Sequence, residues 1–205
     1  MKYTEVTYGA LQSAYDHYNH TLFEDRLPQC LITLQRQKGA AGYYALDRFA
    51  DKAGVNVDEI ALNPEGFNRE PKAVLSTLVH EMTHLQQAHF GNPPRKGYHN
   101  KAWGVLMEAT GLIPSATGVE GGKKTGQSMS HYILAGGAFE LATEELLAGG
   151  FAELLADIWT KVVKPKKAPT RAKFTCPSCG LNAWAKPDSI LVCGECKLLL
   201  KTEEA

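Results

Sequence analysis

Two histidines and a glutamate stand close together in the stretch LVHEMTHLQQ, residues 78–87. If this stretch is helical, the four-residue spacing turns the chain by about 400°, so His80 and His84 share one face. Two imidazoles placed in this way can bind one tetrahedral metal ion. Glu81 lies about 100° round the helix from His80, where its carboxylate can take a proton from a metal-bound water. The spacing predicts the zinc site of a hydrolase.

A catalytic zinc ion needs a third protein ligand and an open fourth position. His99 follows the loop that ends the helix, and a helical hairpin would bring it back toward the first two histidines. Glu108, farther along the chain, is an alternative carboxylate ligand. His89 lies about 140° from the ligand face, so we expect it at the surface.

Four of the five cysteines form two C-x-x-C pairs near the C-terminus, Cys176 with Cys179 and Cys193 with Cys196. Each pair offers two thiolates from a tight turn, and four thiolates close a tetrahedral structural zinc site. A redox dithiol is the competing interpretation, but no thioredoxin-like βαβ pattern surrounds the motifs. The fifth cysteine, Cys30, is most simply a buried strand residue.

The histidine motif lies within a well-bounded helix. Residues 71–90 begin with a proline that the first turn tolerates and end before Gly91. Its apolar residues recur with helical spacing, which predicts a buried face made of Val74, Leu75, Leu78, Val79, Met82 and Leu85. A second helix is predicted at residues 100–111, so the motif sits on the first arm of a helical pair.

Helical periodicity predicts another helix at residues 4–24, and short apolar runs predict strands at 31–37, 42–46 and 55–63. These elements indicate an α+β fold with a small, mostly antiparallel sheet beside the motif helix. Residues 114–128 are rich in Gly, Ser, Thr and Lys, and they predict a mobile loop. A further helix is predicted at 138–163, in two pieces around Gly149 and Gly150.

Between residues 161 and 173 the chain carries six basic residues, no acidic ones and two prolines. This composition predicts an extended linker. We therefore expect three parts, which are a main domain at 1–160, the linker at 161–173 and a small zinc ribbon at 174–205. So small a ribbon would depend on its metal for stability.

The chain has 205 residues, 44% of them hydrophobic and 21% charged, with a formal net charge of zero. This composition is typical of a soluble globular protein and excludes a global electrostatic attraction to nucleic acid. The N-terminus lacks an apolar signal region, and no window is long enough to cross a bilayer. We therefore expect a cytoplasmic protein with no membrane partner.

The linker and ribbon could still bind nucleic acid locally, because lysines neutralise phosphates and aromatic rings stack on bases. The residues that could make these contacts are Lys164, Lys166, Lys167, Arg171, Lys173 and Trp184. Two plainer interpretations stay open: the lysines form a solvated tether, and Trp184 belongs to the core of the ribbon.

The segments LFEDRLPQCLITLQ, EIALNPEGF, VLSTLVHEMTHLQQ and GYHNKAWGVLMEATGL, in this order, resemble the SprT-like metalloprotease domain, the group that includes Spartan. The resemblance covers residues 5–135, and a zinc ribbon after the protease domain is similar to the arrangement in that family. It implies a zincin-like fold in which His80, His84 and His99 bind catalytic zinc and Glu81 is the catalytic base. It also implies cleavage of proteins attached to DNA.

Amide hydrolysis also needs a donor for the developing oxyanion. His131, Tyr132 and Tyr98 are candidates, although each could instead be a packing residue. Two rival functions stay open beside the DNA-associated zinc metalloprotease. One is a non-enzymatic zinc-containing protein that binds DNA or has a regulatory role. The other is a metallohydrolase of small amides.

Overall fold

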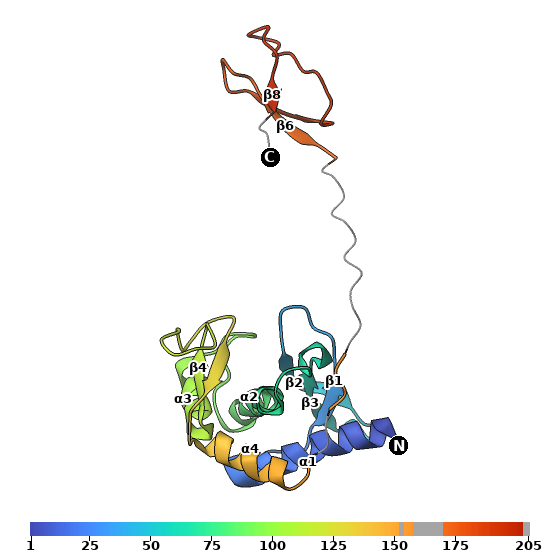
Figure 1. Ribbon diagram of the computed structural model, residues 1–205, viewed down its shortest axis with the longest axis vertical. Coiled ribbons are helices and arrows are strands. Elements are labelled where there is room, and N and C mark those ends of the chain that lie inside the picture. The colour runs from blue at the N-terminus through green and yellow to red at the C-terminus, as the bar shows by residue number, and fades with distance from the viewer. Residues whose placement is uncertain (152–153, 158–169, 203–205) are drawn as a thin grey trace. The chain divides into compact units, whose positions relative to one another are not determined.

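The computed structural model describes residues 1–151, 154–157 and 170–202 (Figure 1). The chain divides into two compact units, Met1–Ile158 and Trp159–Ala205, which we call the main unit and the ribbon unit. Most of the predicted linker, residues 161–169, lies outside the described residues, as do Lys164, Lys166 and Lys167. No helix in the described part of the chain is long and apolar enough to cross a membrane.

The main unit begins with the predicted amphipathic helix, α1 (Tyr3–Phe23). It buries one apolar face, made of Leu11, Ala14, Tyr15, Tyr18 and Phe23. The helix ends at Glu24, which adopts the left-handed conformation and donates its backbone N–H to the Asn19 carbonyl. Figure 1 shows α1 beside α4 (Ala138–Ala148) at one side of the unit.

The main sheet contains β1 (Leu31–Leu34), β2 (Gly42–Ala50) and β3 (Asn56–Leu62) in the order β1-β3-β2. The main sheet is mixed, since β1 pairs with β3 in parallel and β2 pairs with β3 antiparallel over a longer stretch. The connection from β1 to β2 passes round the end of β3. The side-chain amide of Asn63 holds this connection by donating to the carbonyls of Gln37 and Ala40, each at 3.0 Å.

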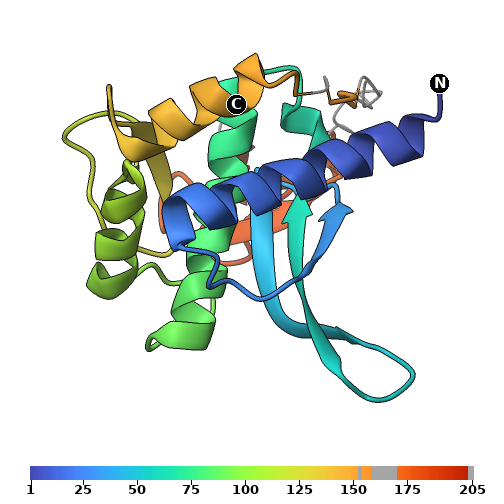
Figure 2. The same ribbon diagram turned by 90° about the horizontal axis from the view of Figure 1, so that it is seen from below.

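Strand β2 continues past its predicted end because a buried carboxylate supports an irregularity in it. The register with β3 shifts between Ala45 and Phe49. Asp58, on β3, accepts hydrogen bonds from the Asp47 backbone N–H at 2.8 Å and from the Tyr44 hydroxyl at 2.8 Å. The hairpin made by β2 and β3 therefore extends beyond the helices, as Figure 2 shows.

Helix α2 (Pro71–Phe90) follows a short 3-10 turn (Pro64–Gly66) and has the predicted bounds. It buries the six predicted apolar residues and also His80 and Glu81. Figure 1 shows α2 end-on, between the main sheet on one side and α3 (Lys101–Thr110) on the other. The histidine motif consequently lies at the centre of the main unit.

Helix α3 ends at Gly111, whose φ of 86° favours glycine and whose Cβ would lie 2.9 Å from the Ala138 nitrogen. The segment predicted as a mobile loop is bracketed by two strands, β4 (Leu112–Ser115) and β5 (Ser130–Ile133), which pair antiparallel. Local composition did not indicate these strands, since their pairing joins residues 15 (Ser115 and Ser130) to 21 (Leu112 and Ile133) positions apart.

Helix α4 ends at Ala148, and no second helical piece follows in the described residues 151 and 154–157. Gly149 and Gly150 explain the stop, since Gly150 has a φ of 90°. Beyond them the chain packs Phe151 and Leu154 against the core. The backbone N–H of Asp157 donates to the Pro64 carbonyl at 3.0 Å, which fastens this segment to the 3-10 turn.

The ribbon unit contains β6 (Ala172–Thr175), β7 (Asn182–Ala185) and β8 (Lys201–Thr202) in the order β7-β6-β8. Its buried residues include Phe174, Cys176 and Cys193. Trp184 is 63% exposed, so it is not the core of this unit.

Replacing Phe139 with alanine tests how α4 is held. Phe139 is fully buried, and its ring stacks on Tyr18 of α1 with centroids 5.6 Å apart. Such a truncation costs about 3–5 kcal/mol in free energy of unfolding, measurable by urea denaturation followed by circular dichroism. Leu141→Ala, on the exposed face of the same helix, should change it by no more than about 0.5 kcal/mol. Equal losses in the two variants would contradict this packing.

Candidate metal centre

The structure brings His80, His84 and His99 together in the main unit. One ring nitrogen from each lies within 4.8 Å of the others. His80 and His84 come from the middle of α2, one turn apart, as their spacing predicts. His99 lies just before α3, next to its N-cap Asn100, and faces His84, with 3.1 Å between their Nε2 atoms. We call these three residues the histidine triad.

The position of His99 depends on backbone contacts with a distant segment. Its N–H donates to the Gly126 carbonyl at 2.8 Å, and the Gly126 N–H donates to the His99 carbonyl at 3.1 Å. The next residue, Asn100, caps α3 by accepting from the Trp103 N–H, and it also accepts from the Gln87 amide of α2 at 3.0 Å. The two arms of the helical pair are therefore tied together beside the triad.

The chemistry of these donors fits a zinc ion. Zinc–imidazole bonds of 2.0–2.1 Å place tetrahedral ligand atoms about 3.3 Å apart, close to the 3.1 Å between His84 and His99. Burial lowers the pKa of His84 to about 3 and the pKa of His80 well below its usual value. Both rings are therefore neutral at pH 7, the form that binds metal.

Trp103 closes the side of the triad that faces α3. Its ring is fully buried, and its centroid lies 4.9, 5.1 and 4.5 Å from those of His80, His84 and His99. Sequence reasoning missed this residue, although its place in the first turn of the second helix of the pair was a usable signal. The indole excludes water from behind the ligands and limits their movement.

Glu81 is buried beside the triad, as its place in the motif predicts. Burial raises the pKa of its carboxyl to about 8, and a hydrogen bond from the Tyr44 backbone opposes this increase. Strand β2 approaches so closely that a Cβ on Gly42 would lie 3.2 Å from Glu81 Oε1 and 2.8 Å from the Ala61 carbonyl. Glycine at this position leaves room for the carboxylate between the strand and the helix.

The alternative ligands lie elsewhere. Glu108 does not join the triad, and its carboxylate accepts a hydrogen bond from Lys124. The His89 side chain lies at the surface, 35% exposed, and contacts the Asp58 carboxylate through Nε2 at 2.7 Å.

A cleft of about 1010 Å³ opens in front of the triad. It is bounded by β2, by residues 93–98 and by residues 127–133. Tyr98, His131 and Tyr132, the candidates for stabilising an oxyanion, all line it. The ring nitrogens of His131 are both engaged, since Nδ1 lies 3.1 Å from His80 Nδ1 and Nε2 lies 2.8 Å from Ser76 Oγ. Burial lowers the pKa of His131 to about 4, so this ring is neutral as well.

The ribbon unit gathers Cys176, Cys179, Cys193 and Cys196, whose sulfurs lie within 4.8 Å of one another. The Sγ atoms of Cys179 and Cys193 are 3.7 Å apart, and zinc–sulfur bonds of 2.3 Å predict about 3.8 Å. The residue after each C-x-x-C pair, Gly180 or Lys197, has a positive φ. The two turns are thus alike, and they present four thiolates with no place for a further ligand.

Zinc content measured by mass spectrometry tests both groups of ligands. We expect two zinc ions in the unaltered chain, since each cluster fits one ion. His99→Ala and Cys193→Ser should each reduce the zinc content to one ion. A site with three or four ligands loses most of its metal affinity when one of those ligands is removed. His89→Ala and Cys30→Ser, which change the same residue types outside the clusters, should keep two. Two ions in either ligand variant would contradict the assignment.

Comparison with known proteins agrees with this geometry. The model of the SprT-like family matches residues 11–121, more than half of the chain. That range contains His80, Glu81, His84 and His99, and it ends before His131. A Salmonella typhimurium protein described as "Uncharacterized protein in mucB 3'region" is 52% identical over 58 residues, which are 28% of this chain and 78% of that protein. This chain is a member of the SprT-like family, a metalloprotease-related family.

Proposed function

We propose that this protein is a zinc-dependent endopeptidase that cleaves proteins associated with DNA. The observation that carries the proposal is the convergence of three neutral imidazoles beside a buried glutamate, at a cleft. In this proposal, residues 1–160 form the protease domain, residues 161–173 the linker and residues 174–205 the zinc ribbon. Family membership supports the first part of this division.

In the proposed reaction His80, His84 and His99 hold the zinc ion. Zinc bound there would lower the pKa of a water molecule toward neutrality and polarise the scissile carbonyl. Glu81 takes the proton of the attacking water and later gives it to the leaving amine. Its buried position beside the triad supports this role, because a carboxylate next to the metal can exchange a proton with a metal-bound water.

The developing oxyanion requires a hydrogen-bond donor in the cleft. Tyr98 and Tyr132 both line the cleft and carry phenol groups, so we propose them for this role. The Tyr98 ring already has a cationic neighbour, with the Arg95 guanidinium 5.3 Å from its centroid. His131 suits this role less well, since both of its ring nitrogens have partners.

Two features favour a polypeptide substrate over the rival functions. The cleft is lined along one side by β2, an edge strand of the main sheet, whose backbone can pair with an extended polypeptide but not with a small amide. A purely structural zinc site would fill all four coordination positions, whereas only three histidines form the cluster among the described residues.

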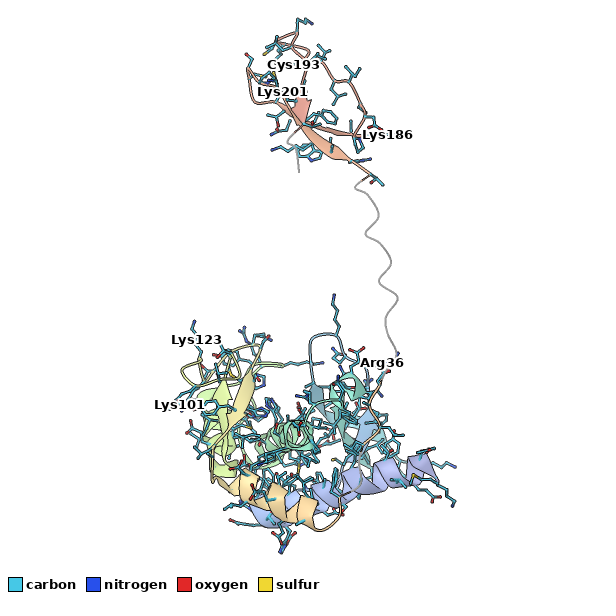
Figure 3. All side chains as sticks on the ribbon, in the orientation of Figure 1. Arg36, Lys101, Lys123, Lys186, Cys193 and Lys201 are labelled. Atoms are coloured by element: carbon cyan, nitrogen blue, oxygen red, sulfur yellow. The ribbon has the colours of Figure 1, made fainter. Side chains whose placement is uncertain are left out.

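The ribbon supports the proposed link with DNA. Lys173 and Trp184 are direct partners in the antiparallel β6–β7 register, so their side chains emerge on the same face. Trp184 is exposed and could stack on an unpaired base, while Lys173 and Arg171 neutralise phosphates. Lys186 and Lys201 also belong to this unit (Figure 3). Four zinc-binding thiolates require a reducing compartment, in keeping with a cytoplasmic location.

Glu81→Gln tests the catalytic role directly. It keeps the size of the side chain but removes its proton-accepting ability, so casein cleavage should fall by about 10²- to 10⁴-fold. Zinc content should stay at two ions per chain. Glu108→Gln, a similar change outside the cluster, should leave the rate unchanged. The assay is run with and without single-stranded DNA, and full activity of Glu81→Gln in either condition would refute the proposed mechanism.

Trp184→Ala tests DNA binding by the ribbon. Loss of one base–aromatic stack costs about 1–3 kcal/mol, which is a five- to hundredfold weaker affinity for a single-stranded oligonucleotide in fluorescence anisotropy. Ile190→Ala removes another exposed apolar side chain, 84% accessible, without an aromatic face. It should bind as tightly as the unaltered chain. Equal affinities of all three proteins would count against a role for Trp184.

A further inference from the structure

The segment between α3 and α4 contacts two of the three proposed zinc ligands from outside the triad. The Gly126 carbonyl lies 3.3 Å from His99 Nδ1, and His131 Nδ1 lies 3.1 Å from His80 Nδ1. Metal-binding histidines commonly donate their second ring N–H to such a partner, which fixes the ring and its tautomer. The contact of His131 with His80 is of this kind.

The direction of each hydrogen bond follows from the hydroxyl of Ser76. This hydroxyl donates its only proton to the Ala73 carbonyl, 3.0 Å away on α2. It must therefore accept a proton from His131 Nε2, at 2.8 Å. A neutral imidazole carries one ring proton, so His131 Nδ1 is left as an acceptor. His80 Nδ1 then donates to it, and the lone pair of His80 lies on Nε2.

We propose that His131, anchored by Ser76, is a positioning residue that keeps the His80 proton on Nδ1 and the Nε2 lone pair free for zinc. The inference rests on the zinc site of the proposed function. It gives His131 a different role from oxyanion stabilisation, since its two nitrogens serve Ser76 and His80. The short strand β5 carries His131, so this strand is required for metal affinity as well as for the shape of the cleft.

His131 is not a fourth ligand in this geometry. The ring nitrogens of the triad lie within 4.8 Å of one another, and His131 does not join that group. Among the rings of the triad, His131 contacts that of His80, with centroids 5.2 Å apart. It therefore touches the triad through His80.

The test compares zinc affinities of full-length variants by competition with a chromophoric chelator. His131→Leu removes the acceptor and should weaken binding at the triad by about ten- to hundredfold. His131→Asn keeps a carbonyl oxygen near the position of Nδ1 and should recover affinity to within about threefold. His17→Leu is the matched control, because His17 is also half-buried and bonds to a carbonyl, that of Ala142 at 2.7 Å. It should bind zinc as tightly as the unaltered chain.

Cobalt substitution separates the two sites, because a four-thiolate site gives intense sulfur-to-metal charge-transfer bands and a three-imidazole site does not. Thermal unfolding of the metal-free variants shows whether His131→Leu is folded. Unchanged triad affinity in folded His131→Leu would overturn the inference, as would equal weakening by Leu and Asn. If the unaltered chain binds cobalt only at the thiolates, the proposed zinc site itself fails, and that result is distinguishable from the other two.

Discussion

Three imidazole rings meet in the interior of the main unit, and one nitrogen from each lies within 4.8 Å of the others. His84 and His99 face each other through Nε2 at 3.1 Å. His99 directs its other nitrogen at the Gly126 carbonyl, so its proton is already used there. A cation bound among these rings would accept a lone pair from each of them, so that one interaction would hold all three together. The elements around the three rings hold them in this arrangement.

Each layer of the main unit helps to position the three rings. Helix α2 provides two ligands and Glu81 at fixed angles, and α3 places Trp103 against all three rings. The sheet brings β2 so near to α2 that glycine is needed at position 42. The β4–β5 segment holds His99 through backbone bonds and reaches His80 through His131. Several separate parts of the main unit therefore hold the three histidines and Glu81 in place.

The ribbon unit also brings potential metal ligands together, but it does so with far fewer residues. Its buried residues are few, and two of its four cysteines are among them. Two similar turns place the sulfurs at a spacing that suits zinc, so a bound zinc ion would supply stability that the main unit obtains from its hydrophobic core. Trp184 is consequently free to face solvent, where a tryptophan in a unit with a packed core would be buried.

The sequence by itself determined what depends on local spacing. The bounds of α1 and α2, the shared face of His80 and His84 and the two cysteine turns all follow from periods of a few residues. It also led to His99 as a candidate ligand, through the short connection between two helices. Only the tertiary structure decided the parallel pairing of β1 with β3, the β4–β5 pair, the end of α4 at Ala148 and the contacts of Gly126 and His131 with the triad. These contacts join residues 27 to 51 positions apart, and no local pattern records which distant residues the packing of the core brings together.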